Sequence, residues 1–373
     1  MTTTAVDNKA TKKAFLDVAR VIYHDDKNWV CPLDIDIEAV FDPSKNNFHQ
    51  HGKCTRWILT GENGQLIGRV AAFINDTKAY NYEQPTGGMG FFECIHDEKA
   101  AFLLFDTAKD WLKTHGMQAM DGPINFGEND NFWGLLVEGF TPPSYGMNYN
   151  PPYYQAFFEH YGFKKLYEQI TNHVDAHKPF PERFTKIAQW LAQKPGYEFK
   201  HFKASEIDKF AADFIDIYND GWRDFENFVP IAKATILESF RKMKPIMDEK
   251  LIWFGYVDGD PASFVVILPD ANQMFKNING KLDLIGKLKF LYYRWKGVSR
   301  MRAIVMGTKQ KYQKHGLESA LFIKLKEYVL PLKQYDELEL SWVGDFNDKM
   351  IALHHSMGGT FGKKHVTMRY IFD

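Results

Sequence analysis

The chain has 373 residues, 45% of them hydrophobic and 25% charged, which is the balance of a globular protein long enough for two domains. A formal net charge of −1 argues against wholesale nucleic-acid binding, and the 16% of aromatic residues favours aromatic-lined clefts. The sequence shows no secretory signal, no run approaching a membrane span and three widely spaced cysteines, so we expect a cytoplasmic protein with reduced thiols and no metal site.

Apolar periodicity predicts alternating helices and strands in the first half of the chain. Helices are expected at 12–23, 98–114, 154–161 and 179–193, and strands at 54–60, 65–74, 91–95, 119–124 and 165–174. The glycine-rich run 87–90 precedes a strand rather than a helix, so we interpret it as a turn and not as a phosphate loop. The segment 145–154 is rich in tyrosine and proline, which suits either the wall of an acceptor site or a rigid packed loop.

The second half repeats this order of elements after a break at 194–196. Strands are expected at 197–202, 250–257, 263–269, 302–306 and 338–343, and helices at 205–218, 230–245 and 316–330. Each half has a hairpin, a lone strand, a long helix, a strand, a short helix that ends in glycine and a last strand. Residues 272–300 are an insertion in this scheme.

The stretch 301–330 joins a buried strand to a helix through a polar loop that carries Lys309, Lys311 and Lys314. The first amides of a helix lack intrahelical partners, and the macrodipole places about half a positive charge there. Such a joint can bind an anion. An ordinary strand–helix junction has the same pattern, so this stretch alone leaves both interpretations open.

Two motifs in this half resemble those of the GNAT N-acetyltransferases. Gln313 and Gly316 match the coenzyme A loop, which reads Arg or Gln, two residues, Gly, one residue, then Gly or Ala; Glu318 stands in place of the last small residue. The second motif of the family is an Asn, then Ala–Leu–Tyr on a helix, then Gly-Phe. It is matched by Asn347, Ala352, Leu353 and Gly358, with His354 in place of the tyrosine and Gly359 in place of the phenylalanine.

The resemblance implies an α/β fold of two tandem GNAT-like domains, each with a mixed central sheet flanked by helices. The predicted domains are 1–195 and 196–373. Asp97 and Glu98 at the start of the helix in the first domain would repel a pyrophosphate. The first domain is therefore expected to be degenerate, without a coenzyme A site, and to act as a structural or substrate-facing partner.

The resemblance also implies an acyl-CoA donor, in the first place acetyl-CoA, and transfer to a small-molecule or peptide amine. The residues expected to bind the cofactor are Val305, Met306, Gly307, Gln313, Lys314, His315, Gly316, Leu317, Glu318, Ser319 and Asn347. His354, with an ordinary pKa of about 6.5, is expected to protonate the departing thiolate, or else to pack on its helix. Glu93, Tyr149 and Tyr153 are expected on the acceptor side, although each also suits a structural role.

Residues 276–302 mix cations with aromatic and aliphatic side chains. Such a segment can lie on a membrane surface, meet an acidic partner such as an acyl carrier, or pack as an insertion beside the cleft. Two other functions stay open from the sequence. Paired GNAT-like domains also resemble the FemABX-like aminoacyl transferases, which use charged tRNA, and the departures at Glu318 and His354 suit a non-catalytic binding protein.

Overall fold

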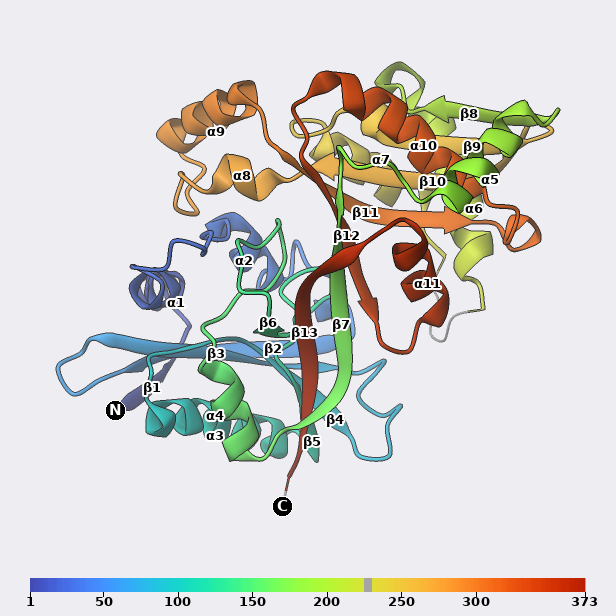
Figure 1. Cartoon of the computed structure of the whole chain (residues 1–373). Coiled ribbons are helices and arrows are strands. Elements are labelled where there is room, and N and C mark those ends of the chain that lie inside the picture. The colour runs from blue at the N-terminus through green and yellow to red at the C-terminus, as the bar shows by residue number, and fades with distance from the viewer. Residues whose placement is uncertain (225–229, 373) are drawn as a thin grey trace.

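A single mixed sheet runs through the whole of the computed structural model, which describes residues 1–224 and 230–372 (Figure 1). Among these residues the strands follow the order β1-β2-β3-β4-β5-β13-β7-β12-β11-β10-β9-β8, and β6 pairs with β13 at the side. The strands of the first half occupy the lower part of Figure 1 and those of the second half the upper part, with β7, β12 and β13 between them.

The first half has its elements in the predicted order, together with three short elements that were not predicted. Its elements are β1 (Thr2–Ala5), α1 (Lys9–Ile22), α2 (Asp34–Val40), β2 (Gly52–Thr60), β3 (Leu66–Asn75), β4 (Thr86–Cys94), α3 (Glu98–Thr114), β5 (Ala119–Gly122), β6 (Leu135–Glu138), α4 (Tyr154–Tyr161), β7 (Lys164–Asp175) and the connecting helix α5 (Glu182–Gln193). The sequence did not predict β1, α2 or β6.

The second half repeats this order with one insertion and, among the described residues, without a counterpart of β6. Its elements are β8 (Tyr197–His201), α6 (Ile207–Trp222), α7 (Lys233–Met243), β9 (Ile252–Val257), β10 (Asp260–Pro269), α8 (Ala271–Phe275), α9 (Leu284–Lys296), β11 (Arg300–Thr308), α10 (Leu317–Val329), β12 (Glu337–Gly344), α11 (Asp348–Ser356) and β13 (Thr360–Ile371). Helices α8 and α9 form the predicted insertion between β10 and β11.

The last strand of each half is shared with the other half. Strand β13 lies between β5 and β7, and β7 lies between β13 and β12. Both strands have 12 residues, and they pair antiparallel along most of their length, from Thr360 opposite His173 to Arg369 opposite Lys164. The two halves are therefore joined by a continuous backbone hydrogen-bond ladder rather than by side-chain contacts alone.

The run 87–90 is wrongly predicted as a turn, because it lies inside β4. Its glycines allow close packing. A Cβ atom on Gly87 would lie 2.4 Å from Leu112, and one on Gly90 would lie 1.8 Å from the carbonyl oxygen of Ile124. A pattern of glycines that indicates a turn in isolation here marks a strand whose neighbours approach its backbone.

The helices cover both faces of the sheet and bury separate clusters. Helices α3 and α4 pack on one face of the first half, around Leu104, Phe105 and Phe158, all fully buried. In the second half, α10 packs on the face that carries Met301 and Leu338, and α6 and α7 cover the opposite face. None of the described helices combines the length and the apolar character needed to cross a bilayer.

Candidate functional site

Strands β11 and β12 diverge in the middle of the second half. Their parallel pairing begins at Arg300 opposite Glu337 and stops at Ala303 opposite Leu340. Strand β11 continues beside β10 as far as Thr308. On the side facing β12, the backbone from Val305 to Gly307 therefore leaves the ladder, at the position where the sequence predicts the pantetheine arm.

The N-terminus of α10 opens beside the end of β11. Gly316 is its N-cap with a φ of 83°, and no side chain caps the helix. The amides of Lys314, Gly316, Leu317 and Glu318 make no hydrogen bond to residues 1–224 or 230–372. The Glu318 carboxylate accepts a hydrogen bond from Thr308 Oγ1 at 2.6 Å, so it is held at the strand end. Unpaired amides at a helix N-terminus fit the pyrophosphate of a coenzyme A.

Gly316 is also a packing position. A Cβ atom there would lie 2.4 Å from Cγ2 of Ile187, on helix α5. Helix α5 thus fixes the start of α10 from the side, and both the positive φ and this contact require glycine.

The predicted residues of α11 are both engaged within the fold. Asn347 caps the helix by accepting a hydrogen bond from the Met350 amide at 3.2 Å. His354 is buried, and its Nδ1 lies 3.1 Å from the Asn172 side-chain nitrogen. Because an amide nitrogen only donates, Nδ1 is the acceptor and Nε2 carries the proton. Burial, with a contribution from His355, lowers the pKa of His354 to about 4, so the ring is neutral at pH 7.

His354 contacts Asn172, the last of three residues paired across β11, β12 and β7. The first of these residues lies where the pairing of β11 with β12 stops. Ala303 pairs with Leu340, and Leu340 pairs with Asn172, the partner of the His354 ring. Neighbouring strands are about 4.8 Å apart. His354 is therefore one strand spacing from β12, which forms one wall of the opening.

The corresponding divergence in the first half is filled by the chain itself. Strands β4 and β5 pair only from Thr86 to Gly88 on β4. The Tyr154 hydroxyl then accepts a hydrogen bond from the Cys94 amide at 2.7 Å, and the Tyr153 hydroxyl donates to the Cys94 carbonyl at 2.9 Å. Asp97 caps α3 by accepting from two amides of its first turn. Tyrosine side chains thus hydrogen-bond to the backbone of β4 at the position where the second half is open.

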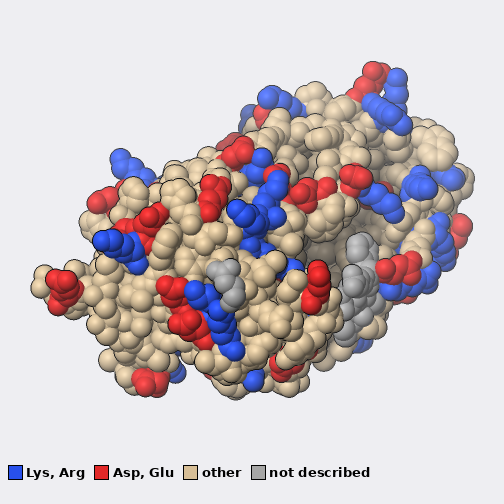
Figure 2. All heavy atoms as spheres, turned by 90° about the horizontal axis from the view of Figure 1, so that it is seen from below, with Lys and Arg blue, Asp and Glu red and all other residues tan. Residues whose placement is uncertain are grey.

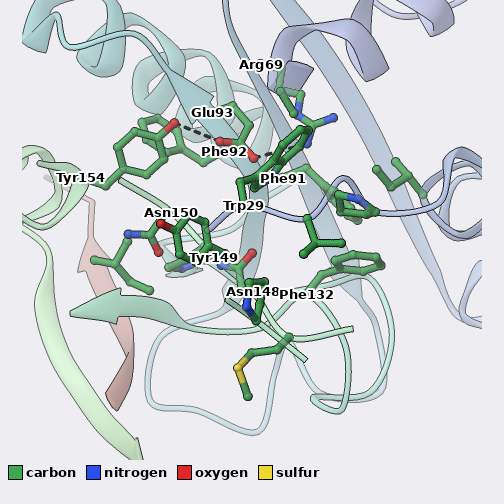
Figure 3. Close-up of a pocket in the computed structure, with 18 of the residues that line it drawn as sticks. Trp29, Arg69, Phe91, Phe92, Glu93, Phe132, Asn148, Tyr149, Asn150 and Tyr154 are labelled. Carbon is green, nitrogen blue, oxygen red and sulfur yellow. Dashed lines mark hydrogen bonds and ion pairs between the residues drawn. The ribbon is translucent and has the colours of Figure 1, made fainter. Parts of the chain in front are cut away.

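A small pocket of about 40 Å³ lies beside β4 (Figure 3). Glu93 projects into it and accepts hydrogen bonds from Tyr23 at 2.6 Å and from Tyr154 at 3.0 Å, while Arg69 lies 3.4 Å away. Burial raises the pKa of Glu93, against the effect of Arg69 and both tyrosines. Tyr149 also lines this pocket, whereas Tyr153 does not and stacks on His96 instead.

A second cavity of about 240 Å³ adjoins the first. The two share Val30, Pro32, Phe132 and Met147 as lining residues. The second cavity extends between α2 and the loop that carries Tyr145, and its wall is mostly apolar. Together the two cavities provide an apolar space that leads away from Glu93.

A row of buried charges crosses the centre of the sheet, where the two halves meet. Glu339 on β12 faces Arg302 on β11 at 3.6 Å and Lys363 on β13 at 3.5 Å, with His173 of β7 at 3.9 Å. Glu339 and Lys363 are fully buried. Arg302 also donates to the Tyr145 carbonyl, which ties the row to the wall of the second cavity.

The row holds polar atoms without hydrogen-bond partners among the described residues. They are both carboxylate oxygens of Glu339, Nζ of Lys363 and Nε of Arg302. Burial would raise the pKa of Glu339, but Lys363 and Arg302 hold it below its usual value; burial lowers the pKa of Lys363. An unpaired buried polar group costs about 1–3 kcal/mol, so the row is suited to receive a polar group or water.

This row is not predicted from the sequence. Its signal is a charged residue at every second position of otherwise apolar strands, as in Arg300 and Arg302 or in Glu337 and Glu339. Charges at every second position normally indicate a face of the sheet that is exposed to solvent. Here the loop before α4 covers that face.

Comparison with known proteins identifies the family. No family model matches the chain. The bacterial ceramide synthase of Caulobacter vibrioides is 30% identical over 373 residues, covering 96% of this chain and 94% of that protein. The chain belongs to the family of this ceramide synthase. Protein YghO of Escherichia coli is 27% identical over 367 residues, and the alignment covers 96% of this chain and 92% of YghO.

Solved structures show the GNAT fold of the family. A tandem GNAT protein from the clavulanic acid biosynthesis pathway superposes with a TM-score of 0.57 at 12% identity, covering 99% of this chain and 98% of that chain. A GCN5-related glucosamine N-acetyltransferase region of a fungal multidomain protein gives a TM-score of 0.55 at 13% identity, covering 99% of this chain and 38% of that one. The chain thus has the fold of two tandem GNAT-like domains, and its membership of the ceramide synthase family points to an acyltransferase.

Proposed function

We propose that this protein is an acyl-CoA-dependent N-acyltransferase that forms an amide on the amino group of a long-chain amine. The observation that carries the proposal is the open divergence of β11 and β12 beside an uncapped helix, in a chain whose equivalent place in the first half is filled. The related ceramide synthase supports the choice of acceptor, because a ceramide is the amide of a fatty acid and a long-chain amino alcohol.

The donor is proposed to bind in the second half. The backbone of Val305, Met306 and Gly307 would align the pantetheine arm, and the unpaired amides within the loop 313–319 would hold the pyrophosphate. Asn347 would act by fixing the start of α11 beside this site. A thioester lying between β11 and β12 would then be separated by β12 from β7, the strand that His354 overlies.

The acceptor is proposed to approach from the first half. Its apolar tail would lie in the two adjoining cavities, with Glu93 and Tyr149 in the wall of the inner one. Its amino group would be held near the buried row, where the Glu339 carboxylate attracts a cation and has unused acceptor capacity. Tyr153 would support the wall from outside through its bond to the Cys94 carbonyl.

The chemistry requires the amine nitrogen to bond to the thioester carbon while the carbon–sulfur bond breaks. The amine loses a proton, and the departing thiolate gains one. His354 is proposed to stabilise the thiolate by donating a hydrogen bond from Nε2, because its ring is neutral at pH 7 and holds no acidic proton to give. The proton that the amine loses reaches the thiolate through water, so the two proton changes balance and the ring stays neutral.

Mass-spectrometric detection of an N-acyl product tests this function. The purified chain would be incubated with acetyl-CoA or palmitoyl-CoA and with sphinganine or its chainless counterpart, 2-amino-1,3-propanediol. We expect an amide from sphinganine and little from the short amine, with the preferred acyl length read from the two donors. Product from neither amine with either donor, while a charged-tRNA assay gives transfer, would replace this function with aminoacyl transfer.

A further inference from the structure

Helix α9 presents an unusual surface for a globular protein. Six of its large apolar side chains are at least half exposed: Leu284, Ile285, Leu288, Leu291, Tyr292 and Trp295, the last at 82%. The helix stands with α8 at the outer edge of the molecule (Figure 1). The first half has no counterpart of α8 and α9 between its strands β3 and β4, so the tandem fold itself does not need this surface.

The exposed side chains share one side of the helix. At about 100° per residue, the six apolar residues fall within an arc of roughly 120°. Gly286, Phe290 and Tyr293 lie opposite the centre of that arc and pack on the body of the protein. The apolar arc therefore points directly away from the protein.

Cations border this arc on both sides. On the same helical projection, Lys287 and Arg294 lie along one margin, about 40–60° beyond the nearest apolar residue of the arc. Lys289 and Lys296 lie along the other margin, about 20–40° beyond the nearest apolar residue. Between Leu284 and Lys296 the chain carries no acidic residue. Over the face of the molecule seen in Figure 2, by contrast, acidic and basic side chains are interspersed.

We propose that α9 docks the protein on an anionic membrane surface. A helix lying in the interface places apolar side chains among the acyl chains while lysine and arginine reach the headgroups at both margins. The two-sided border of cations matches a flat anionic plane better than it matches a single acidic helix of a partner protein. This inference goes beyond the proposed chemistry and does not depend on it.

The docked helix would be connected to the acceptor space by a chain of rings. Phe290 of α9 stacks on Phe275 of α8 at 5.4 Å between centroids, and Phe275 contacts Tyr145 at 5.6 Å. Tyr145 lines the second cavity. A lipid entering from the membrane would thus reach that cavity beside the docking helix.

Vesicle co-sedimentation of the full chain tests the proposal. Vesicles of phosphatidylcholine alone would be compared with vesicles that also contain phosphatidylglycerol, at low and high salt. We expect binding to the anionic vesicles, weakened by salt. The charge reversals Lys287→Glu and Arg294→Glu should each reduce partitioning by about fivefold or more. The combined variant Leu288→Ser, Leu291→Ser, Trp295→Ser should reduce it on the order of a hundredfold.

Trp190→Ser is the matched control, because Trp190 on α5 is also exposed, at 59%, and belongs to another surface. It should bind vesicles as the wild type does. The proposal is overturned if the wild type stays in the supernatant, or if the triple variant sediments equally. A dimer that the triple variant abolishes, or capture of an acidic acyl carrier protein without vesicle binding, would assign α9 to that partner instead. Vesicle binding by a chain without transferase activity would refute only the chemistry.

Discussion

The Glu339 carboxylate lies 3.5 Å from the Lys363 ammonium, and both side chains are completely buried. The two residues come from β12 and β13, on either side of β7, so their contact spans the strands that the halves share. The pair thereby links the joint of the fold to the proposed acceptor site.

Removal of one partner should destabilise the protein strongly. Lys363→Met leaves the carboxylate buried beside Arg302 and His173 only, and Glu339→Gln leaves an uncompensated ammonium; each should cost about 3–5 kcal/mol. The double variant Lys363→Met, Glu339→Gln should cost clearly less than the sum of the two single changes. Urea unfolding of the four proteins measures this coupling, and strictly additive losses would show that the two charges act independently.

The two buried histidines should make stability depend on pH. Burial lowers the pKa of both His354 and His365 to about 4, from an ordinary value of about 6.5. The unfolded chain therefore binds more protons between these values, and stability should fall as the pH drops from about 6.5 to 4, by up to roughly 3 kcal/mol for each ring.

The variants His354→Gln and His365→Gln should each flatten this part of the curve, whatever their stability at pH 7. Urea midpoints measured at several pH values give the slope. His177→Gln is the control for the histidine-to-glutamine substitution itself, because His177 is exposed. A wild-type slope retained in both buried variants would contradict the assignment.

Gly316 should tolerate no side chain without adjustment of α5. Gly316→Ala places a Cβ atom at positive φ and 2.4 Å from Ile187 Cγ2, so we expect a loss of about 2 kcal/mol and weaker binding of acyl-CoA. Ile187→Ala removes the contacted methyl group. The double variant should therefore be more stable than the sum of the single changes predicts, by thermal unfolding, whereas the loss of acyl-CoA affinity should persist in calorimetry.

The order of elements was predictable because its signals are local: apolar periodicity, helix-ending glycines and hairpin turns. The exchange of β7 and β13 was not, since an alternating strand does not specify which distant strand it pairs with. The short elements β1, α2 and β6 span only four to seven residues, too few for a periodic pattern. The buried row was missed for a different reason, because charges on a strand normally indicate solvent.

The loop before α10 is still a predicted donor site that rests on its motif, and the filling of its counterpart in the first half was only partly visible from the sequence. Asp97 and Glu98 indicated a site hostile to phosphate, and the structure shows Asp97 as the cap of α3. The hydroxyls of Tyr153 and Tyr154 come from a helix about 60 residues further along, and their hydrogen bonds to Cys94 depend on tertiary packing.

Asp97→Ala tests whether the N-terminus of α3 has only a structural role. Loss of an N-cap side chain costs about 1 kcal/mol, which thermal unfolding should detect. Calorimetry should give one acyl-CoA per chain for both the wild type and the variant, with equal affinity. A second binding site, or an affinity that changes with Asp97, would mean that the first half takes part in binding the donor.

A bulky residue in the second cavity should separate acceptor binding from donor binding. Ala39 of α2 lines this cavity, and Ala39→Trp would fill much of its roughly 240 Å³. We expect the KM for sphinganine to rise at least about tenfold, because the apolar tail loses its space, while the Kd for acyl-CoA stays unchanged. The control Ala39→Ser keeps the volume and should behave like the wild type. If Ala39→Trp instead weakened only the binding of acyl-CoA, the cavity would hold the acyl chain of the donor. The two substrates would then have to exchange places in the proposed mechanism.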